Sequence, residues 1–129
     1  MNREILFRGK KSNGRWVYGS LVVSENIAPA IYYNVSKGVA DVLDWCYVKP
    51  DTIGQYTGLK DKNGNKIFEG DVVIIGEKLK AKAIYYDGAF RMQSEFSPTP
   101  IDTTDMGYMM REFSVRVIGN VHDDPELIK

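Results

Sequence analysis

The sequence has only one cysteine, Cys46, and one histidine, His122. A single cysteine forms no intrachain disulfide and excludes a zinc site made of four cysteines. This usage is typical of a reducing compartment, so we expect a cytoplasmic protein. No apolar run reaches the roughly eighteen residues of a membrane-spanning helix. The apolar group from Ile5 to Phe7 ends at Arg8 and is too short for the core of a signal peptide.

The chain of 129 residues also lacks an excess of charge of either sign, because 17 Lys and Arg residues balance 17 Asp and Glu residues. A neutral protein lacks the global positive field that drives most nonspecific binding to nucleic acids or membrane surfaces. Charge is nevertheless uneven along the sequence, since the segment from Arg3 to Arg15 is basic and the segment from Asp123 to Glu126 is acidic. The length predicts one domain, or two small subdomains at 1–57 and 58–129 that share a core.

Motifs of catalysis and metal binding are missing as well. The sequence has no serine elbow, phosphate-binding glycine loop or two-histidine metal motif. In the segment Asp61-x-Asn63-x-Asn65 the glycine stands at the fourth position instead of the sixth, so turn chemistry explains it better than a calcium loop. We therefore predict no cofactor and no metal ion.

Cys46 and His122 form the one conceivable pair of thiol and imidazole. Cys46 lies between Trp45 and Tyr47 in a strand pattern, where a small buried hydrophobe is the simpler interpretation. We predict a protein that is not an enzyme, with no catalytic residues. An enzyme whose site is assembled across subunits around Cys46 or His122 is the alternative.

Tight turns are the strongest local signal. Three Asx-Gly pairs predict hairpins, because both residues of such a pair tolerate the positive φ that these turns demand. The pairs are Asn13-Gly14, Asn63-Gly64 and Asp87-Gly88. A further turn at Gly70-Asp71 leads into a buried strand at 72–75. The Asp71 carboxylate is a conceivable general base, but we expect it to accept backbone N–H groups and hold this turn.

Alternation and β-branched runs predict most of the remaining strands. The first hairpin joins 4–8 to 15–23, further strands follow at 28–33 and 42–48, and a meander comprises 72–75, 78–86 and 89–92. A closing strand at 114–121 has a break at Gly119. The prolines of 97–100 predict a loop, and Pro125 predicts a capped terminal turn. Thr103 to Asp105 would cap a short helix, but Gly107 and the β-branched neighbours argue against it.

These short strands predict a mainly β fold with little helix. The entry Glu69-Gly70-Asp71-Val72-Val73 favours an SH3-like, partly open small barrel for the second half, preceded by additional N-terminal antiparallel strands.

Aromatic residues are plentiful, with 8 Tyr, 5 Phe and 2 Trp. If they lie beside cations on the surface, they form a platform on which nucleic-acid bases stack. Packing in a core or between subunits uses the same residues and suits a neutral protein better. The candidates for a nucleic-acid site are Arg8, Arg15, Trp16, Tyr18, Lys78, Lys80 and Lys82. Three lysines on one strand face also commonly keep a sheet solvated.

One block of sequence, Gly58 to Gly64 followed by Lys66 to Val73, resembles the YopX family of phage and prophage proteins. Segments at 15–21, 117–121 and 124–127 support the resemblance. It implies a mostly β fold with an SH3-type barrel, a phage or prophage origin and no established activity, and it supplies no catalytic residues. We expect a protein of the bacterial cytoplasm that acts through protein contacts, as a homo-oligomer or with a host or phage protein. The alternative is a weak nucleic-acid binder that uses the Arg3–Arg15 hairpin and the lysine row.

Overall fold

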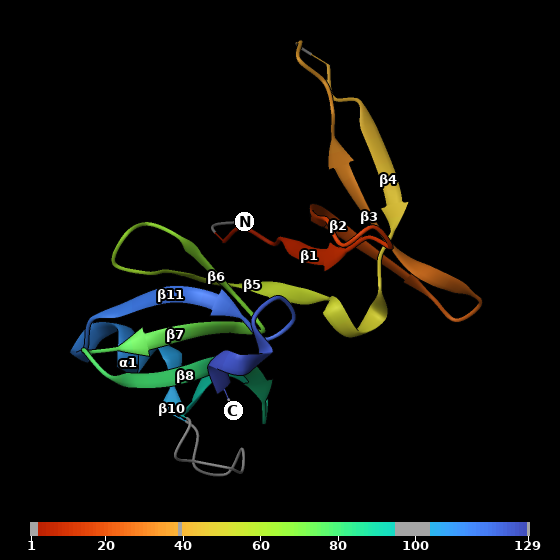
Figure 1. Ribbon diagram of the computed structural model, residues 1–129. Coiled ribbons are helices and arrows are strands. Elements are labelled where there is room, and N and C mark those ends of the chain that lie inside the picture. Colours follow the sequence, from red (N-terminus) through yellow and green to blue (C-terminus); the bar gives the residue numbers. More distant parts are fainter. Residues whose placement is uncertain (1–2, 39, 95–103, 129) are drawn as a thin grey trace. The chain divides into compact units, whose positions relative to one another are not determined.

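The structure is a computed structural model that describes residues 3–38, 40–94 and 104–128. In these residues the chain forms eleven β-strands, one α-helix and two short 3-10 helices, so the mainly β fold is confirmed. The strands build two antiparallel sheets. The chain divides into two compact units, Met1–Tyr56 (unit 1) and Thr57–Lys129 (unit 2), which Figure 1 colours red to yellow and green to blue.

Unit 1 is an antiparallel sheet of strands with the order β4-β3-β2-β1-β5. The strands are β1 (Phe7–Lys10), β2 (Trp16–Ser24), β3 (Ile27–Asn34), β4 (Leu43–Tyr47) and the start of β5 (Gly54–Lys60), with the 3-10 helix η1 (Pro50–Thr52) before β5. Between β1 and β2 the Asn13 Oδ1 accepts from the Arg15 N–H at 3.0 Å, and Gly14 has a φ of +85°. Residue 39 lies outside the described part of the chain.

The register of unit 1 is staggered. Strand β3 pairs with β2 from Ser24↔Ile27 to Ser20↔Tyr32 and with β4 from Ala30↔Tyr47 to Asn34↔Leu43, so only its residues 30–32 have a partner on both sides. Figure 1 shows the consequence, because the β2–β3 and β3–β4 hairpins extend away from β1 as two separate ribbons. Each hairpin is therefore two strands wide near its tip.

Gly19 permits the close crossing of β2 and β3. A Cβ atom at this position would collide with the carbonyl oxygen of Tyr32, so no residue with a side chain fits without opening the pair.

Unit 2 contains an open five-stranded sheet with the order β10-β9-β8-β7-β11. Its strands are β7 (Asp71–Ile75), β8 (Leu79–Tyr86), β9 (Ala89–Ser94), β10 (Thr104–Asp105) and β11 (Val115–Asn120). The end of β5 and the short strand β6 (Lys66–Phe68) flank the Asn63-Gly64 turn. The sequence predicted an SH3-like, partly open barrel for this half. The described residues show an open antiparallel sheet and no closed barrel.

A continuous hydrophobic core fills unit 2. Side chains from β6, β7, β8, β9, β11 and the helix contribute to it: Ile67, Val73, Ile75, Ala81, Ala83, Met92, Met106, Met109 and Val115. On β8 the inward positions Ala81 and Ala83 alternate with the half-buried Lys80 and Lys82. One face of this sheet is therefore covered by side chains of unit 2 itself.

The helix α1 (Met106–Glu112) corrects the expectation of irregular structure in this segment. The Asp105 carboxylate accepts a hydrogen bond from the Tyr108 N–H at 3.1 Å and caps the helix. Met106 and Met109, three positions apart, are both buried, and this burial outweighs the low helix propensity of Gly107. The loop expected at 97–100 lies outside the described residues.

The C-terminal segment has the predicted break and turn. In β11 the register with β7 shifts between Val117 and Gly119. At Gly119 a Cβ atom would lie 2.6 Å from the Asp124 Oδ2, so a larger residue would displace side chains of the turn that follows. The 3-10 helix η3 (Pro125–Ile128) begins at the proline, as expected.

Candidate functional site

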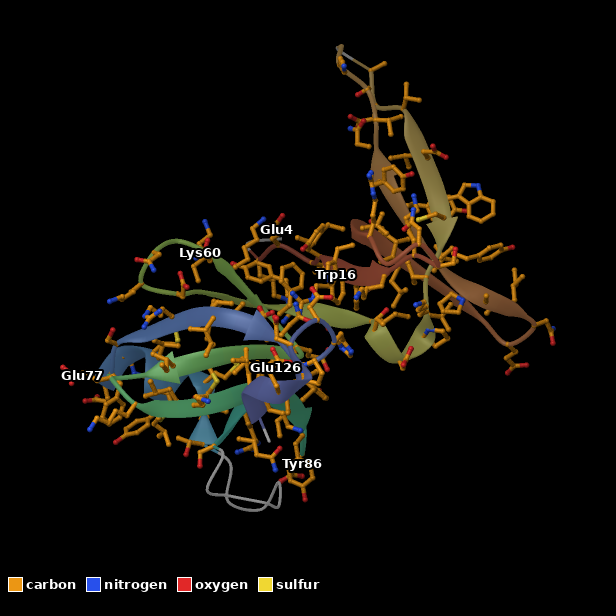
Figure 2. All side chains as sticks on the ribbon, viewed as in Figure 1. Glu4, Trp16, Lys60, Glu77, Tyr86 and Glu126 are labelled. Atoms are coloured by element: carbon orange, nitrogen blue, oxygen red, sulfur yellow. The ribbon has the colours of Figure 1, made fainter. Side chains whose placement is uncertain are left out.

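Most of the large hydrophobic side chains that the described residues expose belong to unit 1. Among the described residues, ten of the fourteen exposed large hydrophobics belong to it, whereas only four of the fifteen buried core residues do: Ala30, Ile31, Val48 and Tyr56. The exposed ones are Ile5, Tyr18, Val22, Val23, Ile27, Val35, Val42, Leu43, Trp45 and Tyr47. Figure 2 shows side chains extending on both sides of the two hairpins. Patches of this kind mark interaction surfaces in soluble proteins.

One face of the hairpins carries an aromatic cluster. Residues opposite each other in register share a face, so Tyr32, Trp45 and Tyr47 lie on the same side of the sheet. The Tyr32 and Trp45 rings are stacked with centroids 6.1 Å apart, and the Tyr47 ring meets the Trp45 ring edge-on at 5.0 Å. A groove of about 210 Å³ runs beside them, lined by Val22, Ser24, Ile27, Ala28, Ala30, Tyr32, Trp45 and Tyr47. We call these eight residues the apolar groove.

The opposite face is more polar. Tyr33 faces Asp44 and Cys46 faces Ile31 in the register. Burial first, and then electrostatic interaction with Asp44 and Cys46, raise the pKa of the Tyr33 hydroxyl above its ordinary value. Cys46 itself is half-buried, and no group of three His, Cys, Asp or Glu side chains suited to a metal ion occurs in the described part of the chain.

Strand β4 forms the edge of the unit 1 sheet. The Val35 N–H donates to the Val42 carbonyl at 2.8 Å, and the Val48 N–H donates to the Pro29 carbonyl at 3.1 Å. In an antiparallel pair, hydrogen-bonded residues alternate with residues whose backbone groups point away. The outward residues of β4 are therefore Leu43, Trp45 and Tyr47. At its centre the Trp45 N–H donates to the Asp44 carboxylate at 2.8 Å.

The structure brings two of the predicted nucleic-acid residues of unit 1, Arg8 and Trp16, into contact. Arg8 is buried, with its guanidinium carbon 4.6 Å from the Trp16 ring centroid, so it is not the exposed cation that the sequence suggested. The Lys10 Nζ lies 5.6 Å from the same ring. Arg15 is exposed after the first turn, and Tyr18 is exposed on β2. The reason for the burial is that Arg8, on β1 between β2 and β5, stacks on an aromatic face.

The lysine row is divided. Lys78 lies in the turn before β8 and is exposed, whereas Lys80 and Lys82 are half-buried on the strand. The Lys80 Nζ donates to the Leu127 carbonyl at 3.4 Å. The three lysines thus do not form one exposed strand face, because the β7–β8 turn includes Lys78.

The predicted turn residues lie at strand junctions. Asp87 and Gly88, between β8 and β9, both have positive φ, of 52° and 79°. Gly64, between β5 and β6, has a φ of +85°, and Asn63 precedes it. Before β7, Gly70 has a φ of +91°, and the buried Asp71 carboxylate accepts the Phe68 N–H at 2.8 Å.

The buried Asp61 carboxylate joins distant parts of unit 2. The Asp61 side chain accepts the N–H groups of Asn63 and Asn65 at 2.9 and 2.8 Å, and the N–H of Val117, 56 positions away, at 2.9 Å. Burial by itself would raise the Asp61 pKa, but these donors outweigh it and lower the pKa. The Asp-x-Asn-Gly pattern signals the local turn, but no local signal predicts the bond to β11.

Comparison with known proteins identifies the family. The family model described as YopX protein matches residues 6–129. The chain belongs to the YopX family. A search of curated proteins finds no match. Among solved structures, this YopX-family chain is similar to protein EF1440 from Enterococcus faecalis, with a TM-score of 0.64 and 23% identity over 99% of this chain and 100% of that one.

The segment that carries the YopX resemblance, 58–73, contains the two carboxylates that organise unit 2. Asp61 joins the β5–β6 turn to β11, and Asp71 holds the entry to β7. This part of the family pattern therefore has a structural explanation within unit 2. No helix in the described part of the chain is long and apolar enough to cross a membrane.

Proposed function

We propose that this YopX-family protein is a phage- or prophage-encoded, non-enzymatic protein that acts through protein contacts as a homo-oligomer. The contact surface is formed by the β2–β3 and β3–β4 hairpins of unit 1. The observation that carries the proposal is the contrast between the two units, because unit 2 has a continuous core and unit 1 exposes ten large hydrophobic side chains.

The energetics of the hairpins support a partner. A two-stranded hairpin is marginally stable in water unless a further layer or strand covers it. Val23, Ile27 and Leu43 are 69, 59 and 63% exposed near the two tips. Burying each such side chain stabilises an assembly by about 1–2 kcal/mol. Several such buried side chains together offset the translational and rotational freedom that is lost on association.

Three further elements belong to the same proposal. Its location is the bacterial cytoplasm, since the lone Cys46 is a free thiol. Residues 1–57 and 58–129 act as two subdomains. The second is a partly open SH3-like barrel, supported by the placement of the last strand, β11, beside the first strand of the meander, β7.

The absence of catalysis in the proposal rests on what surrounds the two candidate groups. Cys46 is half-buried on β4, the edge strand of unit 1, and His122 follows β11 in unit 2. A double Cys46→Ala, His122→Ala variant is expected to support the biological role of the protein as well as the natural chain does. Loss of that role in a stably folded double variant would overturn this part of the proposal.

Oligomerisation is tested by sedimentation equilibrium of the natural chain and two matched variants. Tyr47→Ser removes an exposed ring from the apolar groove, and Tyr108→Ser removes a similarly exposed ring from α1. We expect the natural chain and Tyr108→Ser to associate at micromolar concentration and Tyr47→Ser to associate about tenfold more weakly. A natural chain that stays monomeric at this concentration would refute the proposal.

Nucleic-acid binding is the second candidate, and one observation favours it. Trp16 and Tyr18 lie on one face of β2, and Lys10 sits over the Trp16 ring. Against it, Arg8 is buried and the lysine row is divided. Binding of a labelled single-stranded oligonucleotide at low salt, weakened by Arg15→Ala, is the expected result if this function exists. No change in anisotropy at low salt would eliminate it.

A further inference from the structure

In the described part of the chain, the β4 edge has few of the features that keep other sheet edges from pairing. Natural edges are protected by lysines, prolines, bulges or covering loops. The strand reads Leu-Asp-Trp-Cys-Tyr, with Asp44 as its single charge. Leu43, Trp45 and Tyr47, whose backbone groups point outward, are 63, 45 and 51% exposed.

The edge of the other sheet, at β11, is treated differently. Its outward Val115 carbonyl accepts the Lys62 N–H at 3.0 Å, and its outward Val117 N–H donates to the Asp61 carboxylate. The turn between β5 and β6 thus covers this edge from within the chain. On β4 the one bond of this kind found in the described residues runs from the Trp45 N–H to the side chain of its neighbour Asp44.

We propose that β4 pairs antiparallel with β4 of a second copy of the chain, in a register centred on Trp45. This inference rests on the proposed homo-oligomer and names the strand that joins its subunits. Leu43 then lies opposite Tyr47 of the second copy, and Trp45 lies opposite Trp45. The three outward residues of each strand form about six backbone hydrogen bonds. The Trp45 N–H exchanges its bond with Asp44 for one across the interface.

Charge and strand length select this register. Centring on Trp45 pairs all five residues of β4 and places Asp44 opposite Cys46. Centring on residue 44 instead would set the two Asp44 carboxylates directly opposite each other, which is destabilising. Centring on residue 44 or on residue 46 would also pair only the three residues around the centre. The strand is therefore self-complementary in one arrangement.

The same register completes the exposed aromatic face. A two-fold axis perpendicular to the sheet at Trp45 keeps the same face of both copies on one side. The Trp45 rings become neighbours, and the two apolar grooves lie on one surface on either side of the seam. Near the tip, where Tyr33 and Asn34 of β3 pair with β4 alone, the second copy supplies a third strand.

Two variants at position 43 separate the contribution of the backbone to association from the contribution of the side chain. Leu43→Pro removes an N–H that points away from β3, so the ladder within the chain is kept, whereas Leu43→Ala shortens the side chain and keeps the N–H. The loss of one bond from each strand weakens association about 30-fold beyond the effect of Leu43→Ala in sedimentation equilibrium. Equal dissociation constants for the two variants would overturn the proposal.

Cys46 tests the register in the natural chain, so the result does not depend on the folding of a variant. In the proposed register the two Cys46 residues are diagonal neighbours, about 7–8 Å apart. A short bismaleimide then links two copies, mild oxidation does not, and Cys46→Ser abolishes the link, because a disulfide needs Cβ atoms about 4 Å apart. An oligomer that gives no link refutes the β4 seam and leaves the proposed function standing. A natural chain that is monomeric refutes both.

Discussion

Replacement of Asp61 by Asn tests how a single buried carboxylate stabilises unit 2. Asp61 is 5% exposed, and its oxygens accept three backbone N–H groups and the Asn65 side-chain amide. An amide of the same size has one acceptor oxygen and a donor NH2 group. The variant therefore keeps the volume of the side chain and removes half of its acceptors.

The magnitude follows from the bonds that are lost. Asn accepts the two local N–H groups of Asn63 and Asn65 through Oδ1, so its NH2 group faces the Val117 N–H. A partly buried donor without an acceptor costs about 1–3 kcal/mol, and the remaining bonds lose their charge assistance. We expect Asp61→Asn to lower the free energy of unfolding of unit 2 by about 2–4 kcal/mol.

Far-UV circular dichroism during urea unfolding is the appropriate assay. Both tryptophans, Trp16 and Trp45, belong to unit 1, so their fluorescence does not report directly on unit 2. The matched control is Asp87→Asn, which makes the same chemical change at an exposed turn position with a φ of 52°, where Asn is well tolerated. The control is expected to unfold at the same urea concentration as the natural chain.

The pH dependence gives an independent check, because the folded structure lowers the pKa of Asp61 from its ordinary value of 3.8. A carboxyl with a lowered folded-state pKa contributes stability above its unfolded pKa and loses it as pH falls through the folded value. The difference between the natural chain and Asp61→Asn should therefore be complete at neutral pH and shrink below about pH 4. If Asp61→Asn unfolds together with Asp87→Asn, or the difference persists unchanged into strong acid, this account of Asp61 is wrong.

Three other outcomes are expected. Gly19→Ala destabilises unit 1 by about 3 kcal/mol in tryptophan fluorescence, because its Cβ would collide with the Tyr32 carbonyl, while Ala at the open position Gly38 has little effect. Asp105→Ala costs about 1 kcal/mol by loss of the cap of α1, measured by circular dichroism, and Glu112→Ala, exposed on the same helix, costs almost nothing. The fluorescence midpoint of unit 1 rises with protein concentration, since association stabilises it, and a midpoint independent of concentration would contradict the oligomer.

Turn chemistry explains how much of this fold is readable from the sequence. Hairpin turns depend on two or three adjacent residues, so Asn13-Gly14 and Asp87-Gly88 carry their signal locally. The break at Gly119 and the start of η3 at Pro125 are likewise properties of single residues with unusual backbone requirements. The strands predicted beside these turns differ from the observed ones by a few residues at the ends, whereas β5, β6 and β10 had no predicted bounds.

Long-range contacts explain what the sequence did not reveal. The helix α1 forms because Met106 and Met109 enter a core made by distant strands, and propensity at Gly107 gives no hint of this. Arg8 was placed among exposed cations because its charge is visible in the sequence, whereas its position over Trp16 depends on strand pairing. The exposed groove on β3 and β4 was equally unreadable, since an aromatic strand has the same pattern in a core and at an interface.

The contrast between the two edges links stability to function. Unit 2 uses Asp61 and Lys62 to satisfy outward groups of β11, and α1 contributes Met106 and Met109 to its core, so the β11 edge and the core are covered from within the chain. In unit 1 the β3–β4 hairpin is held by its strand pairing and by the ring contacts of Tyr32, Trp45 and Tyr47, and the described residues show no comparable cover over β4. Selection for a stable monomer would disfavour an edge with Leu43, Trp45 and Tyr47 all exposed, because such edges promote aggregation. Their presence on one strand, in a self-complementary order, is explained if association is the purpose of unit 1 and unit 2 is its stable base.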